Sequence, residues 1–161
     1  MAARAHDPSL RPSAVPWPPI LLAGAIVAAL ALGHYAPLDW PGTDDMAARS
    51  VGIGLGALGL GLVIWAGLTL LRYRTAIFPH HAASHLVTAG PFAFRRNPIY
   101  LGEMLMLLGA AELTKNFWFV LITPIFAALI TWLAIGPEER HLEAKFGDSW
   151  RAYAEKTRRL L

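Results

Sequence analysis

The sequence contains no cysteine and few charged residues, and both shortages limit what the protein can be. Without cysteine it can form no disulfide, no thiol nucleophile and no cysteine-ligated metal site. Asp, Glu, Lys and Arg make up 16% of its 161 residues, whereas soluble domains average about 25%. The scarcity of charged residues therefore argues against an ordinary soluble fold.

Charge is absent from long, apolar stretches of the chain. At a rise of about 1.5 Å per residue, a run of some twenty residues crosses the hydrocarbon core, which is roughly 30 Å thick. We therefore expect an all-α, polytopic membrane protein with four transmembrane helices at about 18–36, 50–71, 98–112 and 117–136. An amphipathic cytoplasmic helix is expected at 137–161, where Leu142, Phe146 and Trp150 or Tyr153 recur at helical spacing. We group the chain into a proline-rich disordered tail (1–17), two N-terminal helices (18–71) and a core (72–161).

The charges that remain predict an orientation. Residues 72–97 contain four arginines and no acid, and the chain from Pro137 onward contains six Lys or Arg. Residues 37–49 instead contain three aspartates and one arginine. The positive-inside rule then places the basic segments, and both termini, in the cytoplasm, most simply of a bacterial inner membrane. Because the basic residues stand where topology requires them, we expect no nucleic-acid partner. The oligomeric state is left open.

The glycine-rich run G-I-G-L-G-A at residues 52–57 superficially resembles a dinucleotide-binding loop. However, no strand precedes it, and it lies inside an uncharged helix. Gly52 and Gly56 fit the small-xxx-small spacing that lets membrane helices approach closely. Helix packing is therefore the preferred interpretation.

A cluster of polar residues begins the third predicted span. Pro98 should open this helix, with Asn97 as its N-cap, and the preceding Arg96 would favour an anionic ligand there. The competing interpretation is that the arginine only sets topology. Glu103 lies inside the same span, where an ionisable residue is costly and faces either a polar cavity or water near the interface.

A second cluster, Glu138-Glu139, directly follows the fourth predicted span. Only about four residues, 113–116, separate the third and fourth spans, so these should form an antiparallel hairpin, with Asn116 capping the second arm. The hairpin would bring Arg96 close to both glutamates. Together they could bind a zwitterion, the arginine taking its carboxylate and a glutamate its ammonium. The plain alternative is that the two acids only stabilise a helix N-terminus.

Three histidines, His80, His81 and His85, occupy the loop before this region. In a helix, His81 and His85 would share a face at a metal-ligand spacing, but no carboxylate stands close in sequence. We expect an interfacial loop and no metal, with a role beside the substrate as a further possibility.

The segments LVTAGPFAFRRNPIYLGE and PEERHLEAKFGDSWRAYAEKTRRLL together resemble the integral-membrane methyltransferases of the isoprenylcysteine carboxyl methyltransferase and phospholipid N-methyltransferase group. The resemblance covers about residues 78–161. It implies a cytoplasm-facing pocket for S-adenosylmethionine and a lipophilic small molecule or lipid as acceptor, entering from the bilayer. By matching position it assigns the following residues to the cofactor: Gly90, Pro91, Arg96, Asn97, Tyr100, Gly102, Glu138, Glu139 and Leu142.

We take Arg96, Glu139 and Glu103 as the candidate catalytic residues. Asn97 stands where the eukaryotic isoprenylcysteine enzymes have histidine, so no role that needs an imidazole is expected at this position. An amine or hydroxyl acceptor would need a base, for which Glu103 and the loop histidines are candidates, whereas a carboxylate or thiolate would not. Two alternatives remain: an NADPH-dependent reductase of the sterol-reductase-like group, and a non-catalytic protein for packing or lipid binding.

Overall fold

The computed structural model describes residues 15–74 and 85–160, and within these ranges the chain is helical, without a β-strand. An isolated bridge pairs Arg95 with Arg158. The predicted disordered tail falls mostly outside the described residues. The helices are α1 (Trp17–Tyr35), α2 (Met46–Arg72), the 3-10 turn η2 (Gly90–Ala93), α3 (Pro98–Thr114), α4 (Trp118–Ile130), the π-helical turn η3 (Thr131–Ile135), α5 (Gly136–Phe146) and α6 (Asp148–Lys156).

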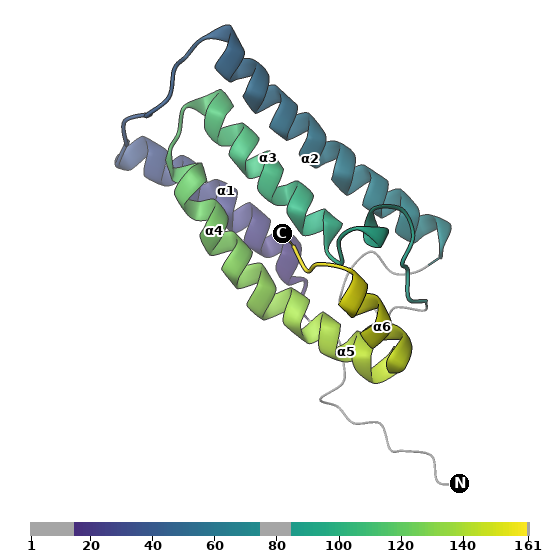
Figure 1. Ribbon diagram of the computed structural model, residues 1–161. Helices are drawn as coiled ribbons and strands as arrows, with labels where there is room; N and C mark the ends of the chain where they lie inside the picture. The colour runs from purple at the N-terminus through teal and green to yellow at the C-terminus, as the bar shows by residue number, and fades with distance from the viewer. Residues whose placement is uncertain (1–14, 75–84, 161) are drawn as a thin grey trace, which may run out of the picture.

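The four long helices lie side by side in the order α2, α3, α4, α1 (Figure 1). The α2–α3 contact is the most extensive, whereas α1 packs on α4 and the turn that follows it. Phe126 and Ile130 of α4 are fully buried in the centre, where they belong to the same core as Leu107 of α3. The core is therefore built around the α3–α4 hairpin that the short connection predicts.

Three helices are long and apolar enough to cross a membrane: Trp17–Tyr35, Met46–Arg72 and Trp118–Phe146. Many large apolar side chains on them point outward, such as Val51, Leu58 and Trp132, as expected for surfaces that face lipid. The chain is therefore an integral membrane protein. Helix α3 begins at Pro98 as predicted but has only 17 residues, and four transmembrane helices are not confirmed.

Glycines allow α2 and α3 to lie in close contact. An added Cβ at Gly102 would lie 2.6 Å from the Gly59 carbonyl oxygen, and one at Gly109 would lie 2.7 Å from the Gly56 nitrogen. A Cβ at Gly52 would press on Glu112 and Leu113 of α3. The prediction that the glycine-rich run serves helix packing is confirmed, since Gly52 and Gly56 lie at the contact with α3.

The fourth predicted span does not end at Gly136-Pro137, and this prediction is wrong. The helix continues through the π-helical turn η3 into α5, forming one helix from Trp118 to Phe146. Pro137 is tolerated because it stands where the turn has already changed the hydrogen-bond ladder, so its missing N–H leaves no α-helical bond broken. As a result, Glu138 and Glu139 are held on a rigid continuation of the span.

The single amphipathic helix predicted at 137–161 is also wrong, because Gly147 divides it into α5 and α6. Gly147 has a φ of 54°, a left-handed value that favours glycine over every residue with a side chain. The break turns α6 back toward the N-terminus of α3, and buries Trp150 and Tyr153. The apolar face of this segment therefore packs on the protein itself.

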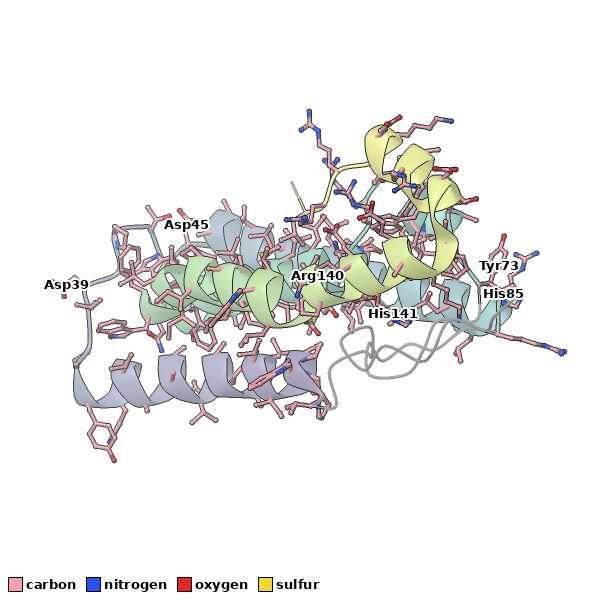
Figure 2. The ribbon with its side chains drawn as sticks, turned by 90° about the horizontal axis from the view of Figure 1, so that it is seen from below. Asp39, Asp45, Tyr73, His85, Arg140 and His141 are labelled. Atoms are coloured by element: carbon pink, nitrogen blue, oxygen red, sulfur yellow. The ribbon has the colours of Figure 1, made fainter. Side chains whose placement is uncertain are left out.

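The bundle has two chemically different ends. Asp39 and Asp45 lie at one end, and Tyr73 and His85 lie at the other (Figure 2). At the first end the Asp45 carboxylate caps α2 by accepting the Ala48 N–H at 2.8 Å. Here the Asn116 side chain also accepts the Trp118 N–H at 3.1 Å, although the N-cap of α4 is Phe117, one residue later than predicted. The candidate site forms at the opposite, basic end.

Candidate active site at the basic end of the bundle

The 3-10 turn η2 lies directly before the residues of the site. Gly90 has a φ of 61°, and an added Cβ would lie 2.9 Å from the Thr69 hydroxyl, so glycine suits this position on two counts. Pro98 then starts α3 and is fully buried. Asn97 stands at the N-cap position but makes no capping bond, so that prediction is wrong. Its side chain instead donates to the Arg159 carbonyl at 3.1 Å.

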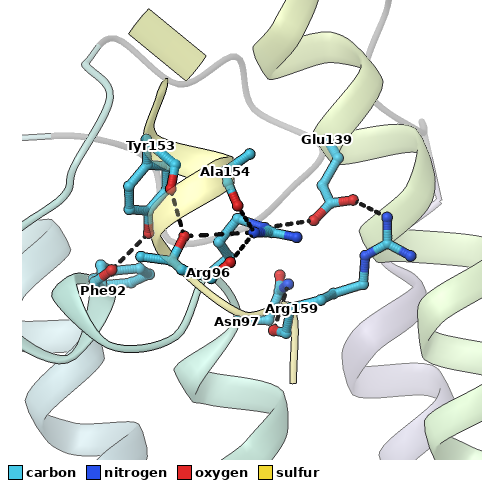
Figure 3. Close-up of polar contacts among 8 residues, drawn as sticks. Phe92, Arg96, Asn97, Glu139, Tyr153, Ala154 and Arg159 are labelled. Atoms are coloured by element: carbon cyan, nitrogen blue, oxygen red, sulfur yellow. Dashed lines mark hydrogen bonds and ion pairs between the residues drawn. The ribbon is translucent and has the colours of Figure 1, made fainter. Parts of the chain in front are cut away.

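Arg96 lies at the centre of the site, between α5 and the end of the chain (Figure 3). Its Nε lies 3.0 Å from Oε1 of Glu139, and both side chains are only 13% exposed. A charge pair this well shielded is held strongly, since removing either partner leaves an uncompensated charge in a poor solvent. The predicted meeting of Arg96 with the glutamates is confirmed for Glu139, while Glu138 lines the same cavity.

The end of the chain completes the coordination of Arg96. Its Nη1 donates to the Ala154 carbonyl at 2.7 Å and also to the Thr157 carbonyl, while its backbone N–H donates to the Arg158 carbonyl at 2.9 Å. Sequence reasoning missed these contacts because the acceptors are backbone oxygens, which no residue pattern reveals. The last residues are therefore part of the site.

A second arginine shares the same carboxylate. Arg159 donates through Nη2 to Oε2 of Glu139, so that one carboxylate bridges two guanidinium groups. Sequence reasoning did not single out Arg159, although its position in the basic tail is visible in the sequence. The Arg96 guanidinium also lies 6.0 Å from the centre of the Trp150 ring, within cation–π range. Both acceptor oxygens of Glu139 are thus in use.

Tyr153 fastens α6 to the loop before α3. Its hydroxyl donates to the Phe92 carbonyl at 2.7 Å. Burial raises the pKa of the Tyr153 phenol to about 12, against a smaller opposing effect of the nearby Arg96 charge. The phenol therefore stays neutral, and able to donate, at physiological pH.

These contacts border an open cavity with about 720 Å³ of empty space, part of which is the solvent at its mouth. No hydrogen bond or ion pair of the Glu138 carboxylate or the Tyr100 hydroxyl reaches another residue of the described ranges. Both groups line the cavity, as does Asn97. The walls come from α2, the loop, α3, α5 and α6, and include Leu70, Val87, Phe92, Ile99, Leu142 and Trp150.

The structure brings together six of the residues that the resemblance assigned to the cofactor: Arg96, Asn97, Tyr100, Glu138, Glu139 and Leu142. Three others do not line the cavity. Gly90 and Pro91 form the turn behind Phe92, and Gly102 packs against α2. Glu103 also lies outside the lining, one helical turn further along α3.

Of the three loop histidines, one lies in the part of the chain that the structure describes. His85 lines the cavity, whereas His80 and His81 lie outside the described residues, so their predicted roles are not tested. Within residues 15–74 and 85–160, no three side chains of the metal-binding types come together.

Fold and site together define an integral membrane protein with an open cavity beside a buried ion pair at one end of its helices. Comparison with known proteins agrees with this class. The profile of the phospholipid methyltransferase family matches residues 47–149, so the chain belongs to that family. The matched region runs from α2 to α6 and includes most of the cavity. No solved structure matches the chain.

Three individual relatives carry different names, and one of these three is named a methyltransferase. The chain is 27% identical over 136 residues to the cobalt-zinc-cadmium resistance protein CzcN of Cupriavidus metallidurans, covering 82% of this chain and 56% of that protein. It is 35% identical over 75 residues to the protein-S-isoprenylcysteine O-methyltransferase of Schizosaccharomyces pombe, covering 44% and 30% respectively. An uncharacterised Haemophilus influenzae protein is 40% identical over 63 residues, its whole length and 39% of this chain. The chain thus spans about half or less of the length of the first two relatives. The family match and the Schizosaccharomyces pombe relative support a membrane methyltransferase in general.

Proposed function

We propose that the protein transfers a methyl group from S-adenosylmethionine to a lipophilic acceptor that reaches the cavity from the bilayer. The observation that carries the proposal is the cavity beside the Arg96–Glu139 pair, whose Glu138 and Tyr100 groups have no bond to another described residue. Buried polar groups are normally satisfied within the protein, so groups left open at a cavity are suited to a ligand.

The residues fit a zwitterionic nucleoside derivative. Within residues 15–74 and 85–160, no ion pair joins the Glu138 carboxylate to a protein cation, so this carboxylate suits an ammonium group of a ligand. Asn97 and Tyr100 provide neutral hydrogen-bonding groups, and apolar side chains such as Leu142 and Trp150 suit a flat base. When bound, S-adenosylmethionine supplies an activated methyl group on a sulfonium.

The sequence predicts that Arg96 alone binds the carboxylate of the ligand. In the structure, Arg96 and Arg159 both bond to Glu139 instead. Arg96 is already bonded to Glu139 and to the end of the chain, so its first task is to shape the cavity. Arg159 keeps Glu139 neutralised from the other side. We propose that Arg96, Arg159 and Glu139 together carry a net positive charge that attracts the carboxylate of the ligand. The backbone contacts of Arg96 hold its guanidinium in place.

The acceptor side of the cavity is apolar. Leu70 of α2 and Ile99 of α3 line it where the helices continue toward the bilayer. A lipophilic acceptor could lie along these side chains with its reacting atom toward the polar end. In such displacements, the enzyme contributes mainly by positioning the reactants and excluding water.

The proposed orientation places this end of the bundle in the cytoplasm of a bacterial inner membrane. The basic loop and the end of the chain lie at the site, and the aspartates lie at the far end (Figure 2). That distribution supports cytoplasmic termini and gives a water-soluble cofactor direct access from the cell interior.

Equilibrium binding of S-adenosylmethionine to the purified protein tests the proposal. Glu138→Gln keeps the shape of the side chain but removes the charge, and we expect it to weaken binding by at least tenfold, roughly one charge-assisted hydrogen bond. Glu143→Gln on the same helix is the matched control, because Glu143 is exposed and pairs only with Arg151 among the described residues. The control should bind as the wild type does.

The same assay with NADPH separates the reductase alternative. Binding of NADPH and not of S-adenosylmethionine would replace the proposed function with that of a reductase. Binding of neither would favour a non-catalytic role.

A further inference from the structure

Two arginines stand opposite each other where the end of the chain passes the start of α3 (Figure 1). Arg95 and Arg158 form an isolated parallel bridge, in which the Arg96 N–H donates to the Arg158 carbonyl at 2.9 Å. Residues paired in this way lie roughly 4.8 Å apart and point their side chains to the same side. Like charges directly opposite each other repel and weaken the pairing. An anion bound between the two guanidinium groups would relieve this repulsion.

The side chains of this pair point away from the cavity. Both neighbours of Arg158 face inward: Thr157 bonds to the Arg96 guanidinium, and Arg159 bonds to the carboxylate with which that guanidinium pairs. The backbone of Thr157 is extended, and successive side chains of an extended chain point to opposite sides, so Arg158 faces outward. Neither Arg95 nor Arg158 belongs to the lining of the cavity. The pair is therefore a second basic group, separate from the candidate active site.

The protein supplies no countercharge to this pair within the part of the chain that the structure describes. No ion pair or side-chain hydrogen bond there joins Arg95 or Arg158 to another residue. Glu155, three residues before Arg158, is exposed and pairs with neither arginine. The two oxygens of Glu139 are already bonded to other arginines. Because Arg158 is exposed and Arg95 partly so, an anion from outside the protein has access to both.

The pair lies near the level of the membrane surface. An added Cβ at Gly90 would lie 2.9 Å from the Thr69 hydroxyl, so the turn η2 lies beside α2. Thr69 belongs to the apolar helix Met46–Arg72 and stands three residues before its basic end. Phe94, next to Arg95, is 69% exposed. An exposed aromatic ring beside arginines at this depth suits the boundary between acyl chains and headgroups.

We infer that Arg95 and Arg158 together bind the phosphate of an anionic phospholipid, whose acyl chains lie against Phe94. Guanidinium groups bind phosphate oxygens through parallel, charge-assisted hydrogen bonds, and two that face the same side suit a single phosphate. A free phosphate ion offers the same chemistry, but it makes no use of the exposed Phe94. The lipid is bound on the outer surface and outside the cavity, so it is a ligand of the protein and not the molecule that is methylated. The inference does not depend on the proposed function.

Matched phospholipids test the inference on the purified full chain in neutral maltoside detergent. Phosphatidylglycerol and phosphatidylcholine with the same acyl chains are titrated, and bound lipid is counted by mass spectrometry of the intact complex. We expect phosphatidylglycerol to bind the wild type about tenfold more tightly, because the choline cation of the other lipid is repelled by the arginines. Inorganic phosphate should compete about tenfold more weakly than phosphatidylglycerol, since it lacks the apolar contact.

Substitutions locate the site. Arg95→Gln and Arg158→Gln should each lower the affinity for phosphatidylglycerol about tenfold. The double variant should lose less than the two single losses multiplied together, because both arginines bind one phosphate. Arg151→Gln is the matched control: it removes one positive charge from α6, where Arg151 is exposed and pairs with Glu143 and Asp148. This control should bind phosphatidylglycerol as the wild type does.

The integrity of each variant is checked separately. Arg95→Gln should keep the helical content of the wild type and its affinity for S-adenosylmethionine in lipid-free detergent, since Arg95 lies outside the cavity. Weaker lipid binding in that folded variant then reports on the lipid site alone.

Three results would overturn the inference and leave the proposed function standing. The first is equal binding of phosphatidylglycerol and phosphatidylcholine by the wild type. The second is inorganic phosphate that competes as strongly as the lipid, which would indicate an anion site without a lipid. The third is a loss in Arg151→Gln as large as that in Arg95→Gln or Arg158→Gln, which would indicate diffuse attraction to a basic surface.

Discussion

The Nε atom of Arg96 lies 3.0 Å from Oε1 of Glu139, although 43 residues separate the two in the chain. Between them stand the whole of α3 and α4, an antiparallel hairpin that returns the chain to the end where it started. The hairpin thus converts two distant, charged motifs into one buried ion pair. Stability and function of the site should depend on this pair in ways that can be measured.

Removing one partner of the pair should destabilise the protein strongly. Arg96→Leu leaves Glu139 with only the partly exposed Arg159, and Glu139→Gln leaves Arg96 short of a countercharge. For pairs this shielded, we expect a loss of roughly 3–5 kcal/mol, seen as a lower melting temperature in detergent. Arg151→Ala is the control, since its pairs with Glu143 and Asp148 are exposed to solvent and should contribute little to stability. Equal losses for buried and exposed arginines would contradict the description of the site.

The end of the chain should be needed for ligand binding but not for the fold. A variant that ends at Lys156 loses the Thr157, Arg158 and Arg159 carbonyls that hold Arg96 and Asn97. We expect cofactor affinity to fall by more than tenfold, because the arginine loses its fixed position. The helical content, measured by circular dichroism, should remain.

The variant Arg158→Ala separates the contribution of the Arg158 backbone carbonyl to cofactor binding from that of its side chain. It keeps the carbonyl that accepts the Arg96 N–H and removes an exposed guanidinium, so we expect wild-type affinity. A loss as large as that of the shortened chain would mean that charge, and not the backbone contact, is what matters here.

Close packing of α2 on α3 should make Gly102 intolerant of any side chain. In Gly102→Ala the new methyl would meet the Gly59 carbonyl oxygen and the Val63 side chain at under 3 Å, so the helices must separate. We expect destabilisation of about 1–3 kcal/mol. Gly61→Ala, on α2 with open space around it, should be neutral or stabilise by up to about 1 kcal/mol, as alanine does in helices. Thermal melts of both variants check this, and a neutral Gly102→Ala would rule out the close approach.

The Tyr153 phenol should lose its proton at a higher pH than an exposed tyrosine does. Because burial raises its pKa to about 12, the phenol's contribution to stability is complete below the unfolded value of about 10 and is lost as pH rises through 12. Ultraviolet titration of the wild type minus Tyr153→Phe isolates this group. The substitution also removes the hydrogen bond to Phe92 and should cost about 1 kcal/mol at neutral pH. A difference titration centred near pH 10 would show that the phenol is solvated.

Much of this arrangement could be predicted from sequence because it follows from local rules. Uncharged runs predict the helices, Pro98 marks the start of α3, and the short connection at 113–116 forces the hairpin that brings Arg96 to Glu139. The glycine contacts follow from small residues at helical spacing.

The rest depends on tertiary context. Pro137 would normally begin a helix, but a π-helical turn carries the span through it. Asn97 holds a capping position, yet its side chain turns to the end of the chain, which residue spacing does not reveal. The contacts of Arg96 with Ala154 and Thr157 use carbonyl oxygens, which every residue has, so no pattern distinguishes them.

Methyl transfer from labelled S-adenosylmethionine tests the central claim most directly. The purified protein is incubated with the labelled cofactor and a total lipid extract of the organism that produces it, and the organic phase is then counted. We predict that label enters the organic phase with the wild type and with Glu143→Gln, and falls at least tenfold with Glu138→Gln, whose charge we assign to the cofactor. No label in the organic phase with the wild type, or equal labelling with Glu138→Gln, would contradict the account.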